Sequence, residues 1–176
     1  APRFEASVEN AFGEVDTTLV SLEQVNDATA TTLFYLRGST GYITFDGRRQ
    51  MRTPSNGQFS IAPGFPGLRL SHTSAGVTSS VDVAGTDDLP RAVGAYENAT
   101  NLRPPLLFPP LLRVSADNTS CSGPGRFDVL EVSYGPGGEF TRLAIDFEHR
   151  CTRGDNTTSS PIFGSVRINS SRPIRE

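Results

Sequence analysis

The sequence lacks lysine and tryptophan entirely, and it holds only one methionine, two cysteines and two histidines in 176 residues. All 16 basic residues are therefore arginine. A chain without lysine has no amine for a Schiff base, no P-loop lysine and no lysine for an isopeptide crosslink. A chain without tryptophan can stack on a sugar ring only through tyrosine or phenylalanine. These absences exclude several large enzyme classes.

Longer patterns are missing as well. No apolar run reaches the roughly 18 residues that cross a bilayer, and the net charge of −3 offers no basic field to nucleic acid. Motifs of the G-x-S-x-G, H-E-x-x-H, C-x-x-C and G-x-G-x-x-G types do not occur. We therefore expect no catalytic residue, no metal, no cofactor, no nucleic-acid partner and no membrane span.

What the sequence does contain is a series of short strand-like runs separated by Gly, Pro, Asn and Asp turns. Only 21–30 has the spacing of a short helix. The pattern predicts one all-β domain over 1–176, an antiparallel β-sandwich or jelly roll, in which 1–22 is an edge strand or one exchanged between copies. The expected strands are 4–9, 17–22, 31–36, 41–46, 57–62, 67–72, 77–84, 111–116, 126–134, 139–147 and 162–169.

The clearest element is a hairpin whose loop is the Gly-Pro-Gly-Gly stretch 135–138. A four-residue loop aligns Leu130 with Leu143, and it sets Glu131 opposite Arg142 as a favourable charge pair. One face of the predicted hairpin then carries the apolar side chains Leu130, Val132, Tyr134, Leu143, Ile145 and Phe147.

The two cysteines lie near the open end of this hairpin. Extending the register places Cys121 opposite residue 152, one position from Cys151, so we expect a disulfide. Two alternatives are a catalytic pair of Cys151 with His149 and a metal clip. Along a strand, Asp146 points away from His149, which leaves that base without an orienting group. A zinc site normally needs four protein ligands, or three and water. The other histidine, His72, is expected as a surface imidazole beside a turn.

Other features suit an extracellular, cell-surface location. The chain begins APRFEAS, which is consistent with a mature end left by signal cleavage. Four N-x-[ST] sequons mark glycosylation candidates at Asn98, Asn118, Asn156 and Asn169. The segment 102–114 is apolar yet interrupted by four prolines, so it is either a crossover that covers one end of the sandwich or an interface. The interface candidates are Leu106, Leu107, Phe108, Leu111 and Leu112.

The segment RFDVLEVSYGPGGEFTRLAIDFEHRC, followed by IFGSVRINS and preceded by YENAT, resembles a pattern in uncharacterised secreted β-domains of GC-rich bacteria. The resemblance covers about 92–170 and places Cys121 and Cys151 where those relatives carry cysteines. It departs from them at His149 and Arg150, where the relatives more often have Gln-His. The resemblance implies a secreted β-domain, often joined to other modules, without an established activity and without a catalytic residue to carry over.

Three functions agree with these features. The first is a non-catalytic structural subunit of an extracellular fibre, filament or coat, which self-associates with identical subunits by donating an N-terminal strand. The second is a carbohydrate-binding module that stacks a glycan on Tyr35, Tyr42 or Tyr96. The third is a hydrolase that uses paired carboxylates.

Overall fold

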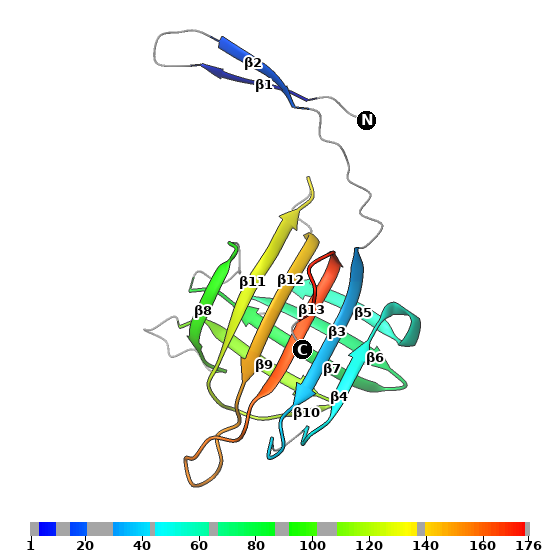
Figure 1. Ribbon diagram of the computed structural model, residues 1–176, viewed down its shortest axis with the longest axis vertical. Coiled ribbons are helices and arrows are strands. Elements are labelled where there is room, and N and C mark those ends of the chain that lie inside the picture. Colours follow the sequence, from blue (N-terminus) through cyan, green and yellow to red (C-terminus); the bar gives the residue numbers. More distant parts are fainter. Residues whose placement is uncertain are drawn as a thin grey trace.

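The computed structural model describes residues 4–9, 15–20, 30–42, 45–63, 67–86, 92–101, 109–136 and 140–174. Eleven strands in this part of the chain form two sheets, and every strand pair within them is antiparallel. The sheets lie face to face, with the strands of one crossing those of the other (Figure 1). The predicted all-β sandwich is confirmed.

The six-stranded sheet has the order β4-β3-β13-β12-β11-β8. Its strands are β3 (Thr31–Gly38), β4 (Arg49–Arg52), β8 (Gly94–Ala99), β11 (Gly125–Tyr134), β12 (Phe140–His149) and β13 (Ile162–Ser170). The five-stranded sheet has the order β10-β9-β7-β6-β5. Its strands are β5 (Gln58–Pro63), β6 (Leu68–Ser74), β7 (Val77–Ala84), β9 (Leu111–Ala116) and β10 (Thr119–Ser120), and a 3-10 turn, η1 (Pro54–Asn56), precedes β5.

A separate pair of strands precedes the sandwich in the chain. β1 (Phe4–Glu9) and β2 (Val15–Val20) are antiparallel and form a two-stranded sheet of their own. The strand expected at 17–22 thus begins and ends two residues earlier. Residues 21–29, where a short helix was considered, lie outside the described residues. No helix in the described ranges is long and apolar enough to cross a membrane.

The core is built from alternate residues of both sheets, because successive side chains of a strand point to opposite faces. It contains Phe34, Leu36, Phe127, Val129, Leu143, Ile145 and Phe147 from one sheet and Leu68, Leu70, Val81, Val83, Leu112 and Val114 from the other. Leu111 and Leu112 are 1% and 0% exposed, so the prediction that they belong to an interface is wrong. They begin β9 and pack inside their own domain. Leu106, Leu107 and Phe108 fall outside the described residues.

The β11–β12 hairpin exists, but its predicted register is wrong. Phe127 pairs with Phe147 and Val129 with Ile145, and the register then shifts at a bulge around Leu130. A bulge inserts one extra residue into one strand. The side chains of β11 that precede the bulge therefore point to the opposite side of the sheet from the one predicted. Phe127 and Val129 therefore fill the core, while Leu130 is only partly buried. The predicted partners Glu131 and Arg142 still form an ion pair, at 3.4 Å.

The outer face of the six-stranded sheet holds a buried arginine. Arg167 is 0% exposed, and its guanidinium uses all five N–H groups. It donates to Asp146 and to the carbonyls of Ile145, Val166, Arg172 and Pro173. The last two contacts hold the C-terminal segment 171–174 against the outer face, and Figure 1 shows the chain turning back over this sheet after β13. The segment therefore shields a charged pair that would otherwise face solvent.

Candidate functional site

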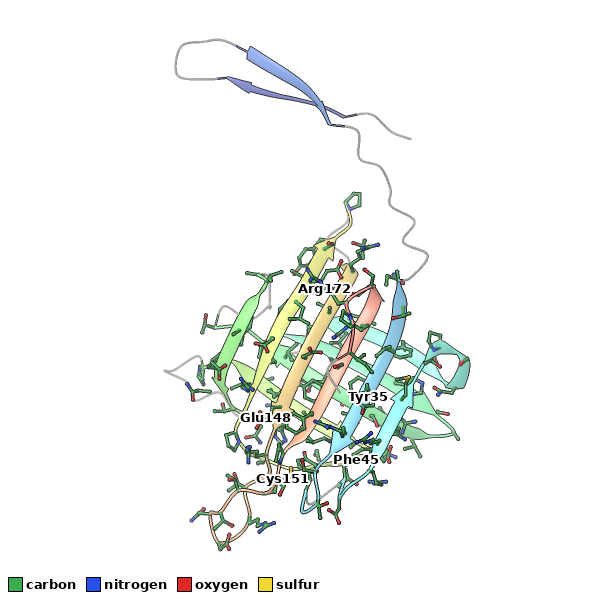
Figure 2. All side chains as sticks on the ribbon, in the orientation of Figure 1. Tyr35, Phe45, Glu148, Cys151 and Arg172 are labelled. Atoms are coloured by element: carbon green, nitrogen blue, oxygen red, sulfur yellow. A yellow bond between two sulfur atoms is a disulfide. The ribbon has the colours of Figure 1, made fainter. Side chains whose placement is uncertain are left out.

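The two cysteines form a disulfide. The Cys121 and Cys151 Cα atoms are 5.5 Å apart, and the bridge joins the segments that flank the open end of the β11–β12 hairpin. Figure 2 shows Cys151 just beyond the lower end of β12. The predicted disulfide is confirmed, and it leaves no free thiol on either residue for the alternative catalytic pair.

His149 lies beside this disulfide and is 0% exposed. Its Nδ1 shares a hydrogen bond of 3.0 Å with the hydroxyl of Tyr42, and that hydroxyl is 3.7 Å from the sulfur of Cys121. Burial lowers the pKa of His149 to about 4, because the low-dielectric interior disfavours the charged imidazole. At neutral pH His149 is therefore an uncharged group sealed in the core.

His72 is also 0% exposed, so the expectation of a surface imidazole is wrong. It points inward because it shares a face of β6 with Leu68 and Leu70. The ring of Phe59 meets it edge-on at a centroid distance of 4.9 Å. Burial first, and the charge of Arg52 in addition, lower the pKa of His72, while a backbone contact with Thr53 opposes the shift.

Two buried histidines predict a stability that falls with acid. The folded pKa of each lies below the unfolded value of about 6.5, so the unfolded chain binds more protons between those values. The contribution of His149 is fully present above pH ~6.5 and is lost as the pH falls toward about 4, and His72 adds a contribution of the same sign. For His149 the loss is roughly 3 kcal/mol, at 1.36 kcal/mol per pH unit. Urea unfolding at several pH values measures it. In His149→Leu, the free energy of unfolding should fall less steeply as the pH is lowered. An equal pH dependence in this variant and the wild type would contradict the depressed pKa of His149.

A groove with charged side chains in its lining crosses the outer face of β8, β11, β12 and β13. One hollow of about 180 Å³ is lined by Arg126, Asp128, Asp146, Phe147, Glu148, Phe163 and Gly164. A second, of about 270 Å³, is lined by Glu97, Asn98, Pro124, Gly125, Arg126, Glu148 and Arg150. Because both include Arg126 and Glu148, they are parts of one depression, which we call the outer-face groove. Figure 2 shows Glu148 on β12 within this sheet.

Strand register creates the groove's charge pattern. Arg126 faces Glu148 across β11 and β12, and Asp128 faces Asp146 two residues along. The Arg126 guanidinium is 3.3 Å from Glu148 and 3.6 Å from Glu97, and Arg150 is 2.8 Å from Glu148. Glu148 raises the pKa of Arg126, mainly through their hydrogen bond. The row Glu97, Arg126, Glu148 and Arg150 thus alternates in charge, whereas Asp128 and Asp146 set two carboxylates opposite each other.

An aromatic ring and a fixed carboxylate complete the groove. Phe163 lies opposite Glu148 on the neighbouring strand, and the guanidinium of Arg37 sits over its ring at 5.0 Å from the centroid. One oxygen of Asp146 accepts hydrogen bonds from Ser165 and from the buried Arg167. The C-terminal segment held by Arg167 therefore lies next to the Asp146 end of the groove.

The tyrosines predicted as sugar platforms do not form this site. Tyr35 and Tyr42 are 6% and 1% exposed, so neither offers an open ring, and that part of the prediction is wrong. Tyr96 is partly buried and stacks on the core residue Phe127 with centroids 4.6 Å apart. The sequence reasoning missed Arg126 and the roles of Glu148 and Phe163 in the groove. The sequence does indicate these positions. In RFDV (126–129) and DFEH (146–149), charged and apolar residues alternate, so the charged side chains of these strands must face away from the core.

The four sequon asparagines share an unusual backbone conformation. Asn98, Asn118, Asn156 and Asn169 are all exposed, with φ values of 55°, 64°, 63° and 47°. Asparagine tolerates this left-handed region better than most residues. Asn118 and Asn156 lie in turns, whereas Asn98 and Asn169 lie near the ends of β8 and β13, where the strand register shifts. The amides of Asn118 and Asn169 donate to backbone carbonyls. Asn98 and Asn156 are the sequons whose side chains have no such contact among the described residues, and glycosylation stays a prediction.

No protein-family model, no curated protein and no solved structure matches this chain. The resemblance to secreted bacterial β-domains therefore stays a prediction. The functional proposal below rests on the geometry of the outer-face groove.

Proposed function

We propose that this chain is a non-catalytic extracellular module that binds a saccharide chain in the outer-face groove. The observation that carries the proposal is the row Glu97, Arg126, Glu148 and Arg150, whose ion pairs run along a continuous depression. The disulfide supports an oxidising, extracellular environment.

The chemistry of the row fits hydroxyl groups. A sugar hydroxyl both donates and accepts hydrogen bonds, whereas a carboxylate only accepts and a guanidinium only donates. A groove that alternates the two can satisfy neighbouring hydroxyls of one ring. Phe163 adds an apolar edge beside the Arg37 guanidinium, which covers one face of its ring. Since Glu97, Arg126, Glu148 and Arg150 alternate in sign, this row has no strong field of one sign, and a neutral polysaccharide is the favoured ligand.

The size of the groove favours a polymer over a small molecule. Each hollow is smaller than the roughly 300–1,000 Å³ of pockets that enclose a drug-sized ligand. The two are contiguous and cross several strands. A chain lying across the sheet can use both, with each residue of the polymer making a few contacts.

Affinity electrophoresis in gels containing soluble neutral polysaccharides tests this proposal. We expect at least one glucan, xylan, mannan or galactan to retard the wild-type protein. Glu148→Gln and Arg126→Gln should weaken that binding by about 10-fold or more, as expected for loss of a hydrogen bond to a charged group.

The matched control is Arg142→Gln. Arg142 pairs with Glu131 across the same two strands but lines neither hollow of the groove. Its loss should leave the retardation unchanged. Equal weakening by all three changes, or retardation by none of the neutral polymers, would count against the groove as a saccharide site.

A second candidate is the structural subunit of an extracellular assembly. The observation in its favour is that, among the described residues, β1 and β2 pair only with each other, while β4, β8, β5 and β10 end their sheets. An isolated two-stranded hairpin is marginally stable, and adding it to a sheet edge of another copy would supply main-chain hydrogen bonds. Analytical ultracentrifugation decides: a monomer at the highest soluble concentration would exclude this route.

A further inference from the structure

The disulfide and His149 form a cluster with the donor atoms of a metal site. One ligand atom from each of Cys121, His149 and Cys151 lies within 4.8 Å of the others. Cys151 and His149 are buried, and Cys121 is partly buried. No other group of three histidine, cysteine or acidic residues in the described ranges meets this condition.

An unpartnered polar atom accompanies the cluster. The Nε2 atom of His149 is buried and makes no hydrogen bond to any residue that the structure describes, although a buried imidazole nitrogen normally has a partner. The other ring nitrogen contacts Tyr42, whose oxygen also approaches Cys121. The structure thus holds two sulfurs, an imidazole and a phenol together where packing alone would favour apolar side chains.

We propose that this cluster has a second, mutually exclusive state, in which the reduced cysteines and His149 bind Zn²⁺. Two thiolates and one imidazole are a ligand set that zinc accepts, with water or the Tyr42 oxygen as the fourth ligand. The ion would then connect the same two segments that the disulfide connects. The two segments would therefore stay crosslinked when the environment becomes reducing.

The conversion balances with a thiol as reductant. Two thiols of a small-molecule reductant supply two electrons and two protons, the Cys121–Cys151 bond breaks into two thiols, and the reductant leaves as its own disulfide. Binding of Zn²⁺ then displaces the two thiol protons to solvent. The sulfurs must separate to bind the ion. Both cysteines lie outside the strands, because β11 begins at Gly125 and β12 ends at His149.

Cobalt spectroscopy tests the proposal directly. The full chain is reduced with a phosphine, freed of it under nitrogen and titrated with Co²⁺, which reports thiolate ligation by a near-ultraviolet charge-transfer band. We expect one Co²⁺ per reduced chain, displaced by Zn²⁺, and no band in the oxidised protein. Zn²⁺ should also raise the melting temperature of the reduced protein, or restore its β-sheet circular dichroism, because a ligand of the folded state stabilises it.

His149→Leu separates a built site from two thiols in a flexible chain. It should weaken Co²⁺ binding by more than the 10–100-fold typical of changes next to a metal site. His72→Leu is the control, since His72 is equally buried but lies on β6 of the other sheet and does not belong to the cluster. Equal affinities in wild type and His149→Leu, or no thiolate band in the reduced wild type, would overturn the proposal.

Discussion

Arg167→Met should lower the free energy of unfolding by about 3–5 kcal/mol, the usual cost of removing one partner from a buried ion pair. The guanidinium is the donor to Asp146 and to four backbone carbonyls. Its removal leaves a buried carboxylate without its cation and releases the C-terminal segment. Urea unfolding at neutral pH measures the effect.

Two comparisons make this result specific. Arg142→Met removes a partly exposed ion pair with Glu131 on the same sheet and should cost less than ~1 kcal/mol. The double change Arg167→Met with Asp146→Leu should recover part of the loss, since no unpaired charge is then buried. A loss under 1 kcal/mol for Arg167→Met alone would show that the buried pair does not hold the outer face together.

Removing the disulfide should lower the free energy of unfolding by an amount similar to that expected for Arg167→Met. Cys121 and Cys151 are 30 positions apart, and the chain-entropy model assigns a loop of this length about 3–4 kcal/mol. We expect this loss for Cys121→Ala with Cys151→Ala, measured as a shift of the urea midpoint. The mechanism is a less constrained unfolded chain, so the β-sandwich should still form at low temperature.

Chemical reduction of the wild type provides the control. With EDTA present, so that no ion replaces the bridge, the reduced protein should lose as much stability as the double alanine variant. A reduced protein as stable as the oxidised one would contradict a bracing role for the bond. If the reduced protein is as stable as the oxidised one only when EDTA is absent, this result would instead indicate the metal-bound state.

Much of the sandwich was predictable because its strands alternate cleanly. The runs 139–147 and 162–169 became β12 and β13 almost unchanged. In the first, Leu143, Ile145 and Phe147 recur at every second position. The register of the hairpin was not predictable. It depends on the bulge near Leu130, and a bulge is decided by packing of the whole sheet and not by local sequence.

The burial of polar side chains was also not predicted from the sequence. Arg167 sits in a strand whose pattern suggests a solvent-facing arginine, and its burial depends on residues 171–174 folding back over the sheet. His72 continues the inward face of β6, so alternation alone could have placed it. The edge strand β8 was missed because its sequence, GAYENA, contains few strand-forming residues and gains its order by pairing with β11.

Glu97 shows why the candidate site could be found only in part. The sequence places Asp146 and Glu148 on one face, and β11 adds Arg126 and Asp128 by the same alternation. The contact of Glu97 with Arg126 requires β8 to pair with β11, and no local pattern predicts that pairing. The groove therefore becomes visible only when the order of the strands is known.

Chemical-shift mapping tests the saccharide account most directly. An oligosaccharide fragment of the retarding polysaccharide is titrated into ¹⁵N-labelled protein, and the perturbed amides are assigned. The account predicts that the largest shifts fall on β8, β11, β12 and β13, around Glu97, Arg126 and Glu148. Shifts confined to the five-stranded sheet, or to the region of β3 and β4 remote from these residues, would contradict it.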